Sequence, residues 1–127
     1  MKYLLDVNAL MAMCHTSHSE HARFHAWHAS QTNAVLASCA IGDLGFIRIS
    51  MTPAYNYTLE GAEKALASMR RDLTGYIDTM PPPRLARWVL SHKQTTDAYL
   101  CQLASANGMK LATFDTRIKD PAAFLIP

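Results

Sequence analysis

This chain of 127 residues has few cysteines and only a small net charge. Its three cysteines, Cys14, Cys39 and Cys101, are an odd number and form no C-x-x-C pair. This argues against a disulfide scaffold and against a cysteine-based zinc site, and it is typical of a reducing cytoplasm. Twelve Lys and Arg stand against ten Asp and Glu. A net charge this small does not by itself indicate nucleic-acid binding.

Long hydrophobic runs are absent as well. No run reaches the ~18 to 20 residues that a membrane span needs. The N-terminal Met1-Lys2-Tyr3 leads to an aspartate at position 6, which argues against a signal peptide. Half of the residues are hydrophobic and 17% are charged, which excludes intrinsic disorder. We therefore expect a soluble, cytoplasmic protein in which residues 1–127 form a single domain.

Short apolar segments alternate with helical patterns along the chain. Strands are expected at residues 3–5, 34–37, 110–114 and 124–126. Helices are expected at residues 7–13, from the capping box at 17–20 to about residue 30, after Ser38 as a possible cap, from Thr58 to residue 73, at 84–91, and at 97–107. This alternation predicts an α/β fold with a parallel sheet covered on both faces.

Two helices have clear end signals. Thr58 is expected to cap a helix whose apolar residues share one face: Leu59, Ala62, Leu66, Met69 and Leu73. Thr95 or Thr96 is expected to cap the helix at 97–107, which Gly108 ends in a left-handed conformation.

Aspartates stand where the expected strands end. Asp6 closes the first strand, Asp115 closes the strand at 110–114, and Asp97 lies in the first turn of a helix. Taken singly, each is common, because aspartate suits turns and helix N-termini. Together they are expected at the carboxyl ends of parallel strands, where α/β proteins bind ligands.

Such a cluster has a definite chemistry. Carboxylates about 4 Å apart repel by about 4 kcal/mol per pair at an effective dielectric constant of 20. The cluster must therefore bind protons or cations. Oxygen ligands without His or Cys favour Mg²⁺ or Mn²⁺ over zinc. A divalent cation held in this way activates water and neutralises phosphate charge, which is the requirement for phosphodiester hydrolysis.

Four motifs carry a family resemblance: Leu4-Leu5-Asp6-Val7-Asn8-Ala9-Leu10, Leu44-Gly45-Phe46-Ile47-Arg48, Thr96-Asp97-Ala98-Tyr99-Leu100 and Leu111-Ala112-Thr113-Phe114-Asp115. In this order they resemble the PIN-domain ribonucleases, and among these the VapC toxins of bacterial toxin–antitoxin systems. The resemblance extends from Tyr3 to beyond Asp115. It implies a three-layer α/β/α sandwich with a short central parallel sheet of four to five strands.

The resemblance also implies site residues. Four acidic residues would bind Mg²⁺ or Mn²⁺ and carry catalysis: Asp6, Asp43, Asp97 and Asp115. Thr113 matches a hydroxyl that supports the last carboxylate. Most similar sequences have Glu where this chain has Asp43, whose oxygens reach about 1.5 Å less far. Asp43 is therefore the weakest of the four, and a plain helix-surface role for it stays open.

The implied activity is that of a metal-dependent endoribonuclease toxin. Its substrate would be transfer or ribosomal RNA, its inhibitor a VapB-like antitoxin, and its assembly a homodimer. One alternative is a PIN module that binds RNA or protein without cutting. Another is a phosphatase of the haloacid-dehalogenase type, because Asp6-x-Asn8 weakly resembles that family's D-x-D loop.

Five histidines crowd into one stretch: His15, His18, His21, His25 and His28. Spacings of three and four place the last four on one helical face. Imidazole suits zinc, so a zinc site is conceivable. A polar stripe beside Phe24 and Trp27 explains the pattern better, and a contact to RNA or a partner protein also stays open.

Overall fold

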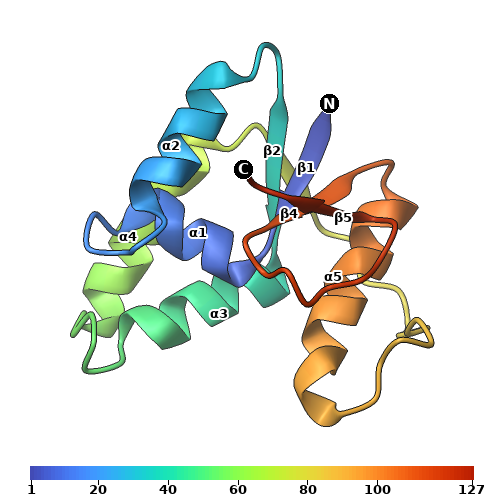
Figure 1. Ribbon diagram of the computed structural model, residues 1–127. Helices are drawn as coiled ribbons and strands as arrows, with labels where there is room; N and C mark the ends of the chain where they lie inside the picture. The colour runs from blue at the N-terminus through green and yellow to red at the C-terminus, as the bar shows by residue number, and fades with distance from the viewer.

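The computed structural model describes residues 1–127 and is built on one parallel sheet (Figure 1). Its five strands are β1 (Lys2–Leu5), β2 (Val35–Cys39), β3 (Gly75–Ile77), β4 (Lys110–Thr113) and β5 (Ala123–Leu125). They lie in the order β3-β2-β1-β4-β5, and every neighbouring pair is parallel. The expected α/β fold with a short parallel sheet is confirmed.

Helices cover both faces of the sheet. They are α1 (Val7–Cys14), α2 (His21–Ser30), α3 (Ala40–Ser50), α4 (Leu59–Asp72) and α5 (Thr95–Ala106), with a short 3-10 helix at His92–Gln94. Helices α1 to α4 lie on one side of the sheet and α5 lies on the other (Figure 1). This gives the three layers implied by the sequence. No helix is long and apolar enough to cross a membrane.

Each face of the sheet has its own apolar core. Because strand residues alternate between faces, Leu5 packs with α1 to α4 while its neighbour Leu4 packs with α5. Phe24 and Phe46 are fully buried in the first core, and Leu100 is buried in the second. Cys39 and Cys101 are buried free thiols and Cys14 is half-buried, as expected for small core residues. The sheet is thereby packed between the two layers of helices.

Several helix ends follow the local sequence. Thr58 caps α4 by accepting the N–H of Gly61 at 3.0 Å, as expected. Gly108 has φ +66° just after α5, so it supplies the left-handed stop that other residues adopt at a cost. Within α4, Ala62 and Met69 are buried, whereas Leu59 is 52% exposed and does not belong to the apolar face.

Three cap predictions are wrong. The chain between Ser17 and Glu20 forms turns, and Glu20 bonds Arg23 instead of completing a capping box. Ser38 lies inside β2, which leaves Cys39 as the residue before α3. Helix α5 begins at Thr95 with no side-chain cap, because the preceding 3-10 helix continues directly into it.

The predicted helix at residues 84–91 is also wrong. The segment is irregular, with a turn in which Val89 donates to the carbonyl of Ala86 at 3.2 Å. At its start, Gln102 of α5 donates to the carbonyl of Pro82 at 3.0 Å and accepts the N–H of Arg84 at 2.7 Å, so a tertiary contact positions the chain. Strand β3 was not expected, because three residues are too short for a recognisable alternating pattern.

Candidate active site

Asp6 is a buried carboxylate at the end of β1. Its side chain is 4% exposed, and its Oδ1 accepts the N–H of Ala9 at 2.7 Å, which caps α1. The local sequence explains this position, because a strand that passes directly into a helix needs a residue such as aspartate at the junction. Oδ1 thus caps α1, and Oδ2 faces the end of β4.

Thr113 connects Asp6 to Asp115. The Thr113 hydroxyl donates to Oδ2 of Asp6 and accepts the backbone N–H of Asp115 at 3.0 Å. The sequence implied that this hydroxyl supports the carboxylate of Asp115. In the structure it supports the carboxylate of Asp6 and binds Asp115 through the backbone.

Asp97 approaches the same edge from α5, and the three carboxylates affect one another. The pKa of Asp6 is raised to about 6, first by burial and then by the charges of Asp97 and Asp115, against the hydrogen bonds from Thr113 and Ala9 that lower it. The pKa of Asp97 is raised, first by burial and then by the charge of Asp115. Burial is the main cause of both shifts, and repulsion between the carboxylates adds to it.

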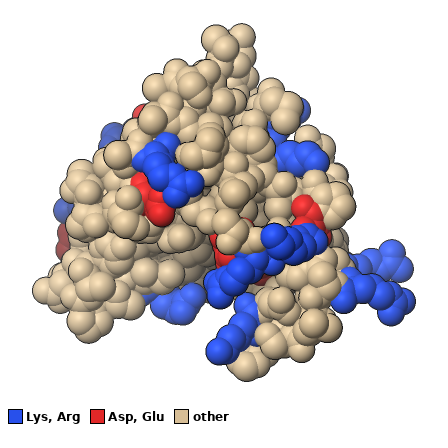
Figure 2. Space-filling model, viewed as in Figure 1, with Lys and Arg blue, Asp and Glu red and all other residues tan.

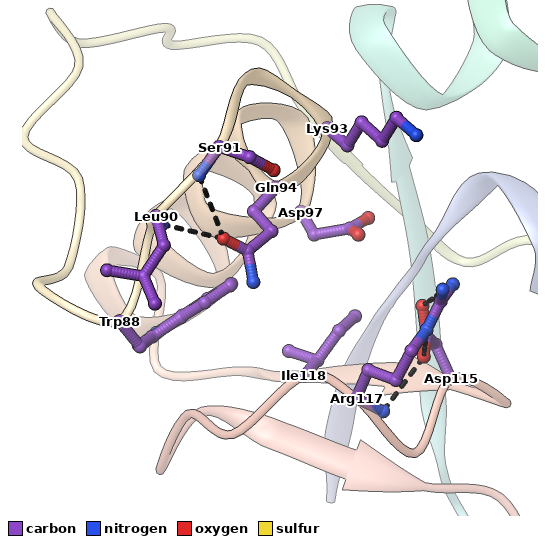
Figure 3. Close-up of a pocket in the computed structure, with 9 residues that line it drawn as sticks. All are labelled: Trp88, Leu90, Ser91, Lys93, Gln94, Asp97, Asp115, Arg117 and Ile118. Atoms are coloured by element: carbon purple, nitrogen blue, oxygen red, sulfur yellow. Dashed lines mark hydrogen bonds and ion pairs between the residues drawn. The ribbon is translucent and has the colours of Figure 1, made fainter.

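Asp115 has a basic neighbour of its own. Nε of Arg117 lies 3.0 Å from Oδ1 and Nη2 lies 3.1 Å from Oδ2, so the guanidinium bonds both oxygens (Figure 3). This pairing lowers the pKa of Asp115. The arginine side chain is 88% exposed and is anchored only at this end. No motif in the sequence singled out this pair, although Arg117 follows the strand-ending Asp115 by only two residues.

Asp43 takes a different partner. It is buried in the first turn of α3, where its Oδ2 accepts a hydrogen bond from Arg70 of α4. Its Oδ1 is buried with no partner. The guanidinium of Arg70 also lies 4.4 Å above the ring of Tyr76. Asp43 therefore joins α3 to α4 in this structure, a role outside both alternatives offered by the sequence.

The donor chemistry of Asp6, Asp97 and Asp115 fits a divalent cation. They are carboxylates, the group that Mg²⁺ and Mn²⁺ prefer, and the charges of Asp97 and Asp115 add to the burial that raises the pKa of Asp6. No three His, Cys, Asp or Glu side chains are gathered as a ready-made metal centre. Two of the four candidate carboxylates, Asp43 and Asp115, bond arginines instead.

A cavity of about 330 Å³ opens beside these carboxylates. It is lined by Trp88, Leu90, Ser91, Lys93, Gln94, Asp97, Asp115, Arg117 and Ile118 (Figure 3). Acidic side chains near the centre of the face in Figure 2 have basic side chains beside them. The cavity thus combines carboxylates with cationic and apolar groups, and no sequence pattern pointed to its non-acidic lining.

The histidine cluster has a structural explanation. His21 Nδ1 lies 2.7 Å from the carbonyl oxygen of Ala12, and His25 Nε2 lies 2.9 Å from that of Met13. These carbonyls belong to the last turn of α1, where helical partners are missing. His15 bonds Ser50 and His18 bonds Asn8, each at 2.9 Å. Each of these rings bonds a different partner, and no three His, Cys, Asp or Glu side chains are arranged to bind a zinc ion.

The chain is similar to curated ribonucleases of Mycobacterium tuberculosis. It is 36% identical to Ribonuclease VapC44 over 126 residues, covering 93% of this chain and 89% of that protein. It is 32% identical to Ribonuclease VapC38 over 126 residues, covering 91% and 86%. It is 31% identical to Ribonuclease VapC39 over 138 residues, covering 97% and 95%. No protein-family model matches the chain.

A solved structure shares the fold. The crystal structure of VapBC2 from Rickettsia felis bound to a promoter DNA fragment matches 98% of this chain and 97% of its own, with a TM-score of 0.64 and 15% identity. The haloacid-dehalogenase alternative loses its basis, because Asn8 bonds His18 and the relatives are ribonucleases. The chain belongs to the VapC family of PIN-domain ribonucleases.

Proposed function

We propose that this protein is a Mg²⁺- or Mn²⁺-dependent endoribonuclease that hydrolyses RNA phosphodiester bonds. The observation that carries the proposal is the environment of Asp6. Its carboxylate is buried, hydrogen-bonded by Thr113 and Ala9, and destabilised by the charges of Asp97 and Asp115. A carboxylate in this state gains most from a cation supplied from solution.

Asp6, Asp97 and Asp115 would hold the cation. Asp43 remains a fourth candidate, since its Oδ1 is free, but its other oxygen is bonded to Arg70. When bound, a divalent cation activates water and neutralises charge on the phosphate and the leaving oxygen.

The surrounding residues position these groups. Thr113 holds Asp6 in one orientation and keeps the Asp115 backbone beside it. Because the pKa of Asp6 is about 6, a proton occupies this carboxylate in acid and competes there with a cation. Lys93 and Arg117 line the adjoining cavity and supply positive charge for the RNA backbone.

Cleavage of a total-RNA pool tests the proposal. The purified chain is incubated with Mn²⁺ or with EDTA, and the new RNA ends are mapped. We expect discrete ends with Mn²⁺ alone, and loss of at least a hundredfold in rate in Asp6→Asn and Asp97→Asn. Asp72→Asn makes the same change at an exposed carboxylate on α4 and is expected to cleave normally. Equal cleavage by all variants would contradict the assignment.

The same assay tests a binding-only module. That alternative has one structural observation in its favour, because Asp43 and Asp115 are already neutralised by Arg70 and Arg117. A non-catalytic protein would retain RNA without producing new ends. Cleavage that needs both Mn²⁺ and Asp6 excludes it.

We further propose that a VapB-like antitoxin inhibits the protein, that the protein is a homodimer, and that its substrate is transfer or ribosomal RNA. The family and the VapBC2 neighbour support the antitoxin. Co-expression with a cognate VapB-like antitoxin should suppress cleavage. Sedimentation of the purified chain measures the dimer, and the mapped ends identify the RNA.

A further inference from the structure

Arg117 occupies most of the hydrogen-bonding capacity of Asp115. Its backbone N–H donates to Oδ1 at 2.8 Å, Nε donates to the same oxygen at 3.0 Å, and Nη2 donates to Oδ2 at 3.1 Å. A carboxylate has about four acceptor positions, and this one residue takes three of them. Asp115 is therefore a poor cation ligand for as long as the guanidinium stays in this place.

The guanidinium of Arg117 is held by this pair alone. Its side chain is 88% exposed, and it makes no hydrogen bond or ion pair other than those to Asp115. Arg70 is different, because its carboxylate partner Asp43 is buried and its guanidinium also lies over the ring of Tyr76. An exposed ion pair contributes little stability, so Arg117 can leave Asp115 at low cost.

A second acceptor for the guanidinium fits beside the first. Arg117 lines the cavity of about 330 Å³ together with Asp97 and Lys93. The carboxylate of Asp97 points toward Asp115 (Figure 3), so the proposed cation and the cavity lie on either side of the guanidinium. The planar fork of arginine matches a phosphate group as well as it matches a carboxylate. The same side chain thus has a carboxylate partner and room for a phosphate partner.

We propose that Arg117 exchanges between these partners. Without a divalent cation it bonds Asp115, and when a cation is bound at Asp97 and Asp115 it releases Asp115 and bonds an RNA phosphate in the cavity. This rests on the proposed cation site and names the residue that couples cation binding to RNA binding. By linkage, a phosphate that draws the guanidinium away strengthens cation binding, and a cation strengthens phosphate binding.

The affinity for Mg²⁺ tests the first half of the exchange. Arg117→Met removes the guanidinium but keeps the backbone N–H that bonds Oδ1 of Asp115, so the carboxylate stays oriented. Isothermal titration calorimetry in phosphate-free buffer measures the affinity. We expect Mg²⁺ to bind the variant about threefold to fivefold more tightly, because it no longer displaces an exposed ion pair.

Lys93→Met is the matched control for that measurement. It removes one positive charge from the same cavity, but Lys93 bonds no carboxylate. Its effect on the Mg²⁺ affinity measures the general loss of charge repulsion. We expect this effect to be smaller than that of Arg117→Met, and thermal unfolding of both variants checks that the fold is retained.

Uridine 5′-monophosphate tests the second half, because it presents a phosphate and has no phosphodiester bond to cleave. Its affinity is measured by NMR titration, once with saturating Mg²⁺ and once in EDTA. With Mg²⁺, Arg117→Met should weaken binding about fivefold or more, the effect of lost hydrogen bonds to a charged group. In EDTA the loss should be smaller, because Asp115 then competes for the guanidinium of the native chain.

The Nε–H signal of Arg117 in the NMR spectrum reports the exchange directly, and its absence from Arg117→Met identifies it. In the native chain, hydrogen exchange of this group with water should accelerate when Mg²⁺ is added alone. It should slow again when uridine 5′-monophosphate follows. The Lys93→Met variant should show the same two steps, since it retains both partners of Arg117.

The outcomes separate the two proposals. An Nε–H signal that saturating Mg²⁺ leaves unchanged, or an equal gain in Mg²⁺ affinity in Arg117→Met and Lys93→Met, overturns the exchange. If the native chain cleaves no RNA with Mn²⁺ while Arg117 behaves as expected, the ribonuclease is overturned and a cation-dependent phosphate site remains.

Discussion

The hydroxyl of Thr113 donates to the carboxylate of Asp6 and ties the end of β4 to the end of β1. Both groups are buried, at 1% and 4% exposure, so neither can replace this bond by one to water. The same hydroxyl accepts the N–H of Asp115. A single side chain thus sets the spacing of two of the proposed catalytic residues.

Replacing Thr113 by valine is expected to destabilise the protein by about 1–3 kcal/mol, because a buried acceptor of Asp6 loses its donor while the shape is conserved. Urea unfolding in EDTA measures the change. Thr113→Ser keeps the hydroxyl and should retain most of the bond. If the Thr113→Val variant and the native chain unfold at the same urea concentration, the hydrogen bond does not stabilise the fold.

Stability should depend on pH through Asp6. Its pKa is raised from 3.8 to about 6 in the folded protein, so the folded state binds this proton more tightly than the unfolded state. The resulting stabilisation is complete below pH 3.8 and is lost as the pH rises through about 6. Between those two pH values the free energy of unfolding of the native chain should fall by roughly 3 kcal/mol relative to that of Asp6→Asn. Parallel stability curves of the two proteins in EDTA would contradict the raised pKa.

Divalent cations should reverse that loss. Because a cation that binds only the folded state stabilises it, millimolar Mg²⁺ should raise the melting temperature of the native chain. The rise should be smaller in Asp97→Asn, which removes one proposed ligand, and unchanged in Asp72→Asn. Differential scanning calorimetry measures all three, and equal shifts would argue against the site.

Asp43 and Arg70 should be energetically coupled. Arg70→Met leaves the buried Asp43 carboxylate without its partner. In the native background this change should therefore lower the free energy of unfolding more than it does in an Asp43→Asn background. A double-mutant cycle from urea unfolding should give a coupling energy of about 1–3 kcal/mol. Additive effects would show that the pair does not join α3 to α4.

The sequence predicted the scaffold because the scaffold depends on local patterns. Apolar segments ending in Asp6 and Asp115 indicated the strands and the parallel sheet, and Thr58 and Gly108 indicated helix ends that the structure confirms. Each of these signals lies within a few residues of the feature that it predicts. Such local signals predict the structure well because they do not depend on contacts between distant segments of the chain.

The failures share a different cause, which is tertiary contact. The start of the irregular segment at 84–91 is bonded by Gln102, which lies on a helix that follows it in the chain. The partner of Asp43 is Arg70, 27 residues away. No periodicity encodes such pairings. The sequence could nevertheless place Asp97 near Asp6, because the topology of a parallel sheet brings strand ends and helix starts to one edge.

Anomalous diffraction from crystals soaked in Mn²⁺ locates the cation itself. We expect an anomalous peak among the carboxylates of Asp6, Asp97 and Asp115, and its absence in crystals of Asp97→Asn. A peak at another place, or none at all in crystals of the native chain at millimolar Mn²⁺, would contradict the proposal that these residues hold a catalytic cation.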